Sequence, residues 1–322
     1  MQNKGECYRI NFPELKFGGL RPKYPIIQGG MAVKVSMAEL AGAVANEGGI
    51  GLIAGTALKV KELKREIKKA RKITDGIIGV NIMFAANDFV NLIKGAISAG
   101  IDLIVSGAGF SRDMFTLGKE GNVPIVPIVS SLRLAKISEK LGADAIVVEG
   151  GNAGGHLGTD KESWELVKKI KDRVSIPVIG AGDVVTPPDM KRMFDLGLDG
   201  VQMGTRFLAS EESDVSSVFK DLCVSAEKED IVRIMSSVGF PANAIKTPFV
   251  EKIMNDRAPS PVKCVDCLKK CSKSFCIREA LLQARSGNYE EGVFFTGEGL
   301  PKIKEILSVK EIFKRFKEYN GN

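Results

Sequence analysis

Residues 147–158 read Val-Val-Glu-Gly-Gly-Asn-Ala-Gly-Gly-His-Leu-Gly, a short apolar run that leads into five glycines and the only histidine of the chain. A parallel barrel or sheet presents its site in this way, at the carboxyl ends of its strands. Glycine lets the backbone pass close to a flat ligand, and His156 can give or take a proton near neutral pH. The alternative interpretation is a strand-to-loop turn that carries a surface histidine.

Eight short apolar runs, including the one above, alternate with amphipathic segments. The runs are 25–28, 49–54, 77–83, 103–106, 125–129, 145–149, 177–180 and 200–203, and segments with a period near 3.6 residues lie at 36–46, 60–72, 88–99, 131–141 and 187–196. Continuously apolar strands that alternate with helices predict a parallel sheet covered by helices. Eight such units in about 185 residues predict a closed (β/α)8 TIM barrel, with a doubly wound open sheet as the alternative.

The alternation stops after residue 207, and the rest of the chain has a different character. Residues 211–256 contain no buried-strand run and read as polar helices, and a cysteine cluster follows them. The stretch 292–300 is again rich in apolar residues and glycine, and a closing helix is expected from 301 to 319. We therefore expect a barrel over 1–207, a smaller and mainly helical insertion over 208–291, and a return to the barrel over 292–322.

Composition limits the classes of partner. The formal net charge of +7 comes with lysines that are mixed with glutamates on helical faces such as 59–72, which indicates solvated helices and no nucleic-acid partner. No apolar run approaches the roughly 20 residues that span a bilayer, and residues 1–5 carry no hydrophobic signal segment. We expect a cytoplasmic protein without a membrane partner. An electron-donor protein and a homodimer stay open as partners.

Two glycine loops predict a phosphate site. Gly180 and Gly182 follow the seventh apolar run, and Gly204 and Thr205 follow the eighth. The loops after strands seven and eight of a barrel often bind phosphate because their backbone N–H groups point at the anion. A phosphate-bearing cofactor is therefore expected, and the alternative is an ordinary tight turn after the seventh run.

Five ordered motifs resemble the nitronate monooxygenase family, formerly called 2-nitropropane dioxygenases, which also includes the flavin-dependent enoyl-acyl-carrier-protein reductase of type II. The motifs are Tyr-Pro-Ile-Ile-Gln-Gly-Gly-Met at 24–31, Asn-Glu-Gly-Gly-Ile-Gly at 46–51, Gly-Val-Asn at 79–81, Ala-Gly-Gly-His-Leu-Gly at 153–158 and Val-Gln-Met-Gly-Thr-Arg-Phe at 201–207. The resemblance covers 15–207 and resumes at 292–300.

This resemblance implies FMN in a TIM barrel, with His156 near the reacting carbon of a small-molecule substrate. Together with the strand ends, it gives the expected cofactor-binding residues Gly29, Met31, Asn81, Glu149, Gly154, Gly155, Gly180, Gly182, Gln202, Met203, Gly204 and Thr205. Three positions depart from the pattern of many members, which have Gln at the position of Glu149, Glu at that of Asn152 and Gly at that of Asp183. We expect the carboxyl group of Glu149 to affect the flavin potential or the choice of substrate.

Four cysteines form the motif C-x2-C-x3-C-x4-C at Cys264, Cys267, Cys271 and Cys276. Thiols with this spacing can bind one metal centre, and disulfides are not expected in the cytoplasm. The centre is either a structural zinc site or a [4Fe–4S] cluster. The C-x2-C-x3-C opening resembles that of iron–sulfur flavoenzymes of the dienoyl-CoA reductase type, which favours the cluster.

Two classes of activity fit these features. The first is oxidation of alkyl nitronates or nitroalkanes, in which FMN takes an electron from the substrate and oxygen completes the reaction. The second is reduction of the activated double bond of an enoyl thioester, with electrons from the cluster or from NAD(P)H. His156 would deprotonate or orient a nitroalkane in the first and stabilise an enolate in the second. The third interpretation is a protein without enzymatic activity, in which the barrel serves as a scaffold for metal binding.

Overall fold

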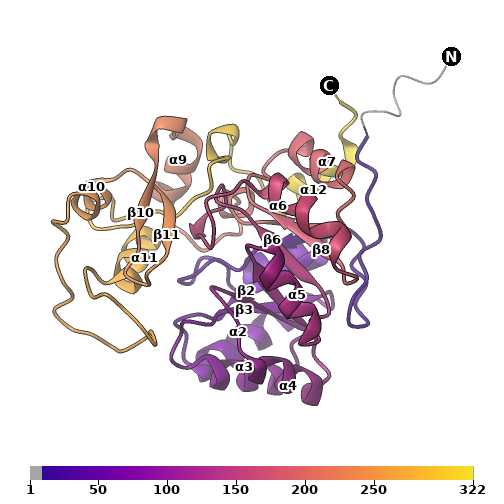
Figure 1. Cartoon of the computed structure of the whole chain (residues 1–322). Coiled ribbons are helices and arrows are strands. Elements are labelled where there is room, and N and C mark those ends of the chain that lie inside the picture. The colour runs from indigo at the N-terminus through magenta and orange to yellow at the C-terminus, as the bar shows by residue number, and fades with distance from the viewer. Residues whose placement is uncertain (1–8, 322) are drawn as a thin grey trace.

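Eight parallel strands form a closed barrel at the centre of the molecule (Figure 1). The computed structural model describes residues 9–321, so residues 1–5 and Cys7 lie outside the described part. The barrel strands, in order around the barrel, are β1 (Ile26–Gln28), β2 (Ile50–Ala54), β3 (Ile78–Met83), β4 (Leu103–Gly107), β5 (Ile125–Val129), β6 (Ile146–Glu149), β8 (Val178–Ala181) and β9 (Gly200–Met203). Each coincides with one predicted apolar run. The (β/α)8 barrel is therefore confirmed, and the open sheet is excluded.

Helices connect the strands and cover the outside of the barrel. They are α1 (Ala38–Asn46), α2 (Val60–Ile73), α3 (Phe89–Ser98), α4 (Arg112–Gly121), α5 (Leu132–Lys140), α6 (Ser163–Ile170) with the 3-10 turn η1 (Lys171–Arg173), α7 (Pro187–Asp195) and α8 (Thr205–Leu208). Local sequence explains where α7 begins. Thr186 forms a capping box with Asp189 and is followed by proline in the first helical turn, so two otherwise unpaired donors are satisfied where the helix begins.

Two layers of apolar side chains hold the barrel together. The inner layer takes alternate residues of the strands, such as Leu103 with Val105 and Ile179 with Ala181, because successive side chains of a strand point to opposite faces. Leu15 and Phe17, from the segment before β1, belong to the same inner cluster. The other face of each strand packs against the helices. Gly51 of β2 permits a close approach there, since a Cβ atom would lie 1.9 Å from the carbonyl oxygen of Ala41 in α1.

The insertion is a mixed α/β unit beside the carboxyl end of the barrel, drawn in orange in Figure 1. It contains α9 (Ser217–Ser225), η2 (Lys228–Asp230), β10 (Ile231–Met235), β11 (Pro241–Ile245), α10 (Pro248–Met254) and α11 (Ile277–Ser286). β10 pairs antiparallel with β11, and β11 pairs with the two-residue strand β7 (Gly155–His156). The insertion contains more helix than strand, as predicted, but residues 231–245 form two strands where polar helices were expected. β10 is mostly half-exposed or exposed, so it lacks the continuous apolar run that marks a buried strand.

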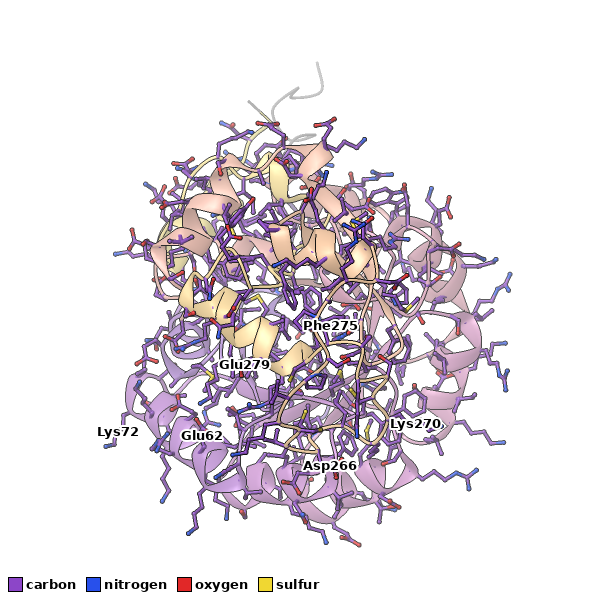
Figure 2. All side chains as sticks on the ribbon, turned by 90° about the vertical axis from the view of Figure 1, so that its left-hand side faces the viewer. Glu62, Lys72, Asp266, Lys270, Phe275 and Glu279 are labelled. Carbon is purple, nitrogen blue, oxygen red and sulfur yellow. The ribbon has the colours of Figure 1, made fainter. Side chains whose placement is uncertain are left out.

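The segment between α10 and α11 carries the four cysteines and docks on the barrel. Asn87, just after β3, donates its N–H to the carbonyl oxygen of Cys267 at 3.1 Å, and Lys269 donates to that of Ala85 at 2.8 Å. Figure 2 views the molecule from this side and labels Asp266 and Lys270 in the segment. The insertion thus covers the carboxyl end of the barrel.

After the insertion the chain returns to the barrel. The N–H of Ile245 in β11 donates to Phe294 at 2.9 Å, and Glu298 donates to Asn152, in the loop after β6, at 3.1 Å. The 3-10 turn η3 (Leu300–Lys302) follows, and α12 (Val309–Glu318) begins at the cap Ser308. The closing helix therefore begins eight residues later than predicted. None of the helices described over residues 9–321 is long and apolar enough to cross a membrane.

Candidate active site

A cavity of about 240 Å³ lies at the carboxyl ends of the barrel strands, between the barrel, the insertion and the return segment. The predicted residues that line it are Gly29, Met31, Asn81, Glu149, Gly154, Gly155, His156, Gly182, Gln202, Met203, Gly204 and Thr205. Gly180 is the exception. It lies inside β8, where a Cβ atom would meet Leu198 and Met193, so its role is close packing against the helix layer.

Two buried amide oxygens in the cavity wall have no hydrogen-bond partner among the described residues, Oδ1 of Asn81 and Oε1 of Gln202. The amide of Asn81 is held in place because its Nδ2 donates to the carbonyl oxygen of Gly30 at 2.9 Å. A buried acceptor without a partner costs free energy. Two such acceptors in one wall fit a ligand with hydrogen-bond donors along its edge.

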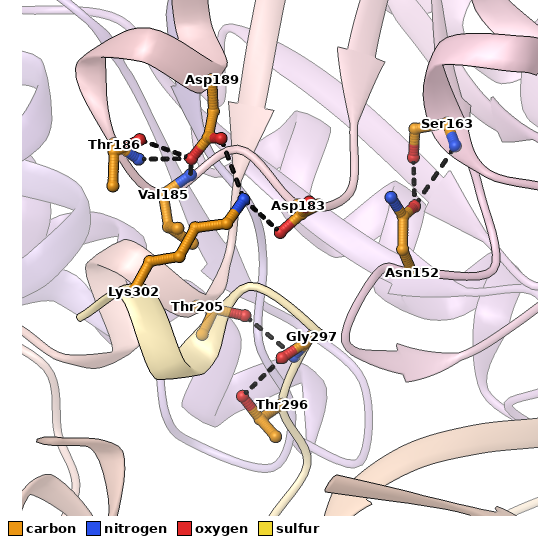
Figure 3. Close-up of polar contacts among 10 residues, drawn as sticks. All are labelled: Asn152, Ser163, Asp183, Val185, Thr186, Asp189, Thr205, Thr296, Gly297 and Lys302. Carbon is orange, nitrogen blue, oxygen red and sulfur yellow. Dashed lines mark hydrogen bonds and ion pairs between the residues drawn. The ribbon is translucent and has the colours of Figure 1, made fainter. Parts of the chain in front are cut away.

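The glycine loops after β8 and β9 form the second feature of the cavity. Gly182 has a φ of +102°, and a Cβ atom there would lie 2.3 Å from Oγ of Ser163, so a side chain is not accommodated. The return segment closes on the same place, where the N–H of Gly297 donates to Oγ1 of Thr205 at 3.0 Å (Figure 3). Backbone thus reaches the cavity from three segments, as an anion site requires.

Asp183, beside Gly182, shares a lysine from the return segment with a second carboxylate. Nζ of Lys302 lies 3.0 Å from Asp183 and 2.9 Å from Asp189 in α7 (Figure 3). Burial raises the pKa of Asp183, and the hydrogen bond from Lys302 opposes that rise. Lys302 offsets one of the two negative charges beside the place where a phosphate would bind.

His156 is held by residues that are distant in sequence. Its Nε2 lies 2.9 Å from Oγ of Ser236 in the β10–β11 turn, and its ring packs edge-on against Phe295 at 5.2 Å between centroids. Burial lowers the pKa of His156 to about 4, so the imidazole is uncharged at neutral pH. The insertion and the return segment, and not the barrel alone, therefore decide the position and the charge of this residue.

Glu149 ends β6, beside Ala181 of β8, and lines the same cavity. Its side chain has no hydrogen bond or ion pair with another residue of 9–321. Burial without a compensating cation raises the pKa of Glu149 to about 8. Its carboxyl group is thus mainly protonated at neutral pH and can donate a hydrogen bond or a proton.

Asn243 of β11, which holds the glycine stretch in place, was not identified from the sequence. This buried side chain donates to the carbonyl oxygens of Gly151 and Ala153, both at 2.9 Å. Its own oxygen accepts a hydrogen bond from Nε of Arg233 at 3.2 Å. These partners are some 90 residues apart in the chain, so no local pattern could have identified them.

The structure does not support the predicted metal centre at Cys264, Cys267, Cys271 and Cys276. Within residues 9–321, no group of three or more His, Cys, Asp or Glu side chains is arranged to hold a metal ion. Two of the sulfur atoms accept backbone N–H groups of their own turns, Cys264 from Asp266 at 3.5 Å and Cys271 from Lys273 at 3.4 Å. Cys267 instead lies in the cavity wall. The thiols are free, and neither zinc nor a [4Fe–4S] cluster is supported.

Known proteins resemble this chain over most of its length. The family described as "Nitronate monooxygenase" matches residues 15–100 and 89–318. A 5-hydroxy-7a-methyl-1-oxo-octahydro-1H-indene-4-carboxyl-CoA dehydrogenase of Mycobacterium tuberculosis is 31% identical over 248 residues, which covers 76% of this chain and 69% of the relative.

Two solved structures share the whole architecture. FabK of Thermotoga maritima is 36% identical with a TM-score of 0.84, covering 92% of this chain and 94% of its own. A nitroalkane oxidase of Streptomyces ansochromogenes, 21% identical with a TM-score of 0.79 and a coverage of 92% and 95%, shares the fold. Since the family match spans most of the residues, including the cavity wall described above, the chain belongs to the nitronate monooxygenase family, a family of oxidoreductases.

Proposed function

We propose that this protein is an FMN-dependent reductase of an enoyl thioester. The observation that carries the proposal is the pair of uncharged side chains in the cavity, the protonated Glu149 and the neutral His156. Addition of hydride to an enoyl thioester produces an enolate, which needs a hydrogen-bond donor at its oxygen and a proton at its α-carbon. A neutral imidazole can donate the hydrogen bond, and a protonated carboxyl group can donate the proton.

FMN fits the cavity by two independent features. The unpaired amide oxygens of Asn81 and Gln202 would accept hydrogen bonds from the flavin edge. The glycine loops at Gly182 and Gly204 would bind the phosphate through backbone N–H groups. When bound, FMN supplies the two-electron transfer that the side chains of this protein cannot perform.

The protein's own residues would bind and orient the thioester and supply the proton. Ser236 fixes the ring of His156, which can then hydrogen-bond the thioester oxygen. Glu149 can release its proton to the substrate carbon, since a carboxyl group of pKa about 8 is both protonated and able to donate near neutral pH. NAD(P)H provides the two electrons for each turnover.

Two comparisons support this substrate class. FabK, an enoyl-acyl-carrier-protein reductase, shares 36% of its residues with this chain over nearly all of both. The Mycobacterium tuberculosis relative is named for a substrate carried on CoA. The nitroalkane oxidase, at 21% identity, supports only the fold.

Oxidation of nitronates is the second candidate, because the family description names that activity. The low pKa of His156 is unfavourable for removing a proton from a nitroalkane, since so weak a base holds the proton poorly. A preformed nitronate needs no base, so this candidate applies to nitronates rather than to nitroalkanes.

Anaerobic and aerobic assays of one preparation separate the two functions. The FMN-reconstituted protein is given crotonyl-CoA with NADH or NADPH under argon, and propyl-2-nitronate in air. We expect oxidation of the nicotinamide coupled to formation of butyryl-CoA. Oxygen uptake with the nitronate and no reduction of crotonyl-CoA would replace the proposal by the second candidate. Chromatography of the flavin released from the purified protein before reconstitution tests the cofactor independently, and FAD, or no binding of FMN on reconstitution, would contradict it.

A further inference from the structure

The cavity wall contains one positive charge that the structure does not balance. Its ionisable acid, base and guanidinium groups are Glu149, His156, Asp183 and Arg278. The first two are uncharged near neutral pH, and Asp183 is paired with Lys302. The half-buried side chain of Arg278 has no hydrogen bond or ion pair with another residue of 9–321. An unpaired guanidinium in a partly enclosed site indicates an anionic ligand.

Arg278 lies far from the glycine loops that fit the FMN phosphate. It is the second residue of α11 and is close enough to Cys267 to oppose the rise in thiol pKa that burial causes there. Cys267 is in turn hydrogen-bonded to Asn87, just after β3. In the closed barrel, β3 lies across from β8 and β9, which carry the glycine loops. The anion that would pair with Arg278 is therefore a different group from the FMN phosphate.

The walls around Arg278 are apolar, and the nearby surface is basic. Leu268, Ile277 and Leu281 line the cavity at this side. Residues 256–279 contain six basic residues and three acidic residues, Asp256, Asp266 and Glu279. Apolar walls beside a half-buried cation fit a long uncharged arm that ends in an anion, and the basic segment raises the local concentration of such a ligand.

We propose that Arg278 binds a phosphate of the phosphopantetheine arm that carries the thioester. The planar guanidinium can bind two phosphate oxygens at once. The substrate class is then a thioester on CoA or on a phosphopantetheine-bearing carrier, and not a free acid or a simple ester. This inference rests on the proposed function, since a reductase of thioesters is required for the arm to be present.

The test compares two substrates that differ only beyond the thioester. Crotonyl-CoA carries the phosphates, whereas the crotonyl thioester of N-acetylcysteamine has the same reacting group and ends before them. For Arg278→Gln we expect KM for crotonyl-CoA to rise by about 10-fold or more, which corresponds to the loss of about 1.4 kcal/mol or more. KM for the truncated thioester, kcat and the FMN content should stay the same. Arg278→Lys should retain part of the effect because it keeps the charge.

Lys252→Gln is the matched control, since Lys252 is exposed, lies in the same insertion and does not line the cavity. It should leave both KM values unchanged. Equal changes for both thioesters in Arg278→Gln, or no change, would overturn the inference. So would a change confined to KM for NADH or NADPH, which would assign Arg278 to the reductant. Absence of thioester reduction by the wild-type protein would instead refute the proposed function.

Discussion

At the scale of single residues, the site depends on two groups whose charge is set by burial. Neither Glu149 nor His156 has a charged partner in the cavity, so desolvation alone moves their pKa values, one up to about 8 and the other down to about 4. Opposite shifts in neighbouring acid and base groups are typical of catalytic sites. In a surface loop the glutamate would be ionised at neutral pH and the histidine would titrate at about 6.5, so burial changes the charge of Glu149 and the basicity of His156.

The first prediction concerns His156. We expect His156→Ala to lower turnover by about 10²-fold, the usual contribution of a positioned acid or base, while FMN stays bound. Ser236→Ala should lower turnover less, because it removes only the contact that orients the ring. Steady-state kinetics and the flavin absorbance of the purified variants provide the measurement. Wild-type turnover in His156→Ala would show that the imidazole only packs in the wall.

The second prediction is a pH dependence. If protonated Glu149 supplies the proton, kcat should fall as the pH rises through about 8, because the carboxyl group ionises there. Glu149→Gln should lower kcat at neutral pH and abolish this alkaline limb. A pH–rate profile from 6 to 10 measures both effects. An alkaline limb that persists unchanged in Glu149→Gln would mean that another group titrates.

At the scale of secondary-structure elements, the antiparallel sheet of β10, β11 and β7 connects the insertion to the glycine stretch. Pairing of Ala242 with His156 and of Asn243 with Gly155 fixes the backbone that leads into the active site. The side chain of Asn243 adds hydrogen bonds to two further carbonyl groups. The sheet therefore positions His156 and also attaches the insertion to the barrel.

The third prediction tests this connection. Asn243→Ala leaves two buried carbonyl oxygens without donors and should lower the free energy of unfolding by about 2 kcal/mol. It should also weaken FMN retention, because residues 151–155 border the cavity. Thermal unfolding and flavin release on gel filtration measure the two effects. Asn255→Ala, at the exposed end of α10, is the control and should change neither.

The fourth prediction concerns the cysteine segment. Cys264 and Cys271 are exposed, whereas Cys223 is buried and its pKa is raised to about 12 by desolvation. In a Cys7→Ser background we expect Ellman's reagent to modify the exposed thiols of the folded protein rapidly and Cys223 only after denaturation. Protection of all four segment cysteines that a chelator removes would instead indicate the metal centre that their spacing predicts.

At the scale of the whole molecule, the cavity exists because three parts of the chain meet over the end of the barrel. The barrel supplies the amides and glycine loops, the insertion supplies Ser236 and Arg278, and the return segment supplies Phe295 and Lys302. The barrel alone would leave the site open to water. The other two parts therefore create the buried environment that shifts the pKa values of Glu149 and His156.

The sequence by itself determined the barrel and most of the cavity wall. Strand and helix periodicity is a local property, and the strand ends of a parallel barrel must meet at one side, so eight apolar runs were enough to bring Asn81, Gln202 and His156 together. Gly180 was the exception, because period-two alternation turns it toward the helix layer. In the insertion, β10 is mostly half-exposed and β11 buries mainly alanine and asparagine, so neither strand shows the apolar run that predicts a buried strand.

Only the tertiary structure decided what these residues can do. His156 meets Ser236 across 80 residues of sequence, and the protonation of Glu149 follows from burial by segments from the whole chain. Cysteine spacing likewise showed that four thiols could meet, but the turns that contain them direct two sulfur atoms to their own backbone. Contacts between distant segments, and the solvent they exclude, are not contained in any local pattern, so charge, partner and orientation had to come from the fold.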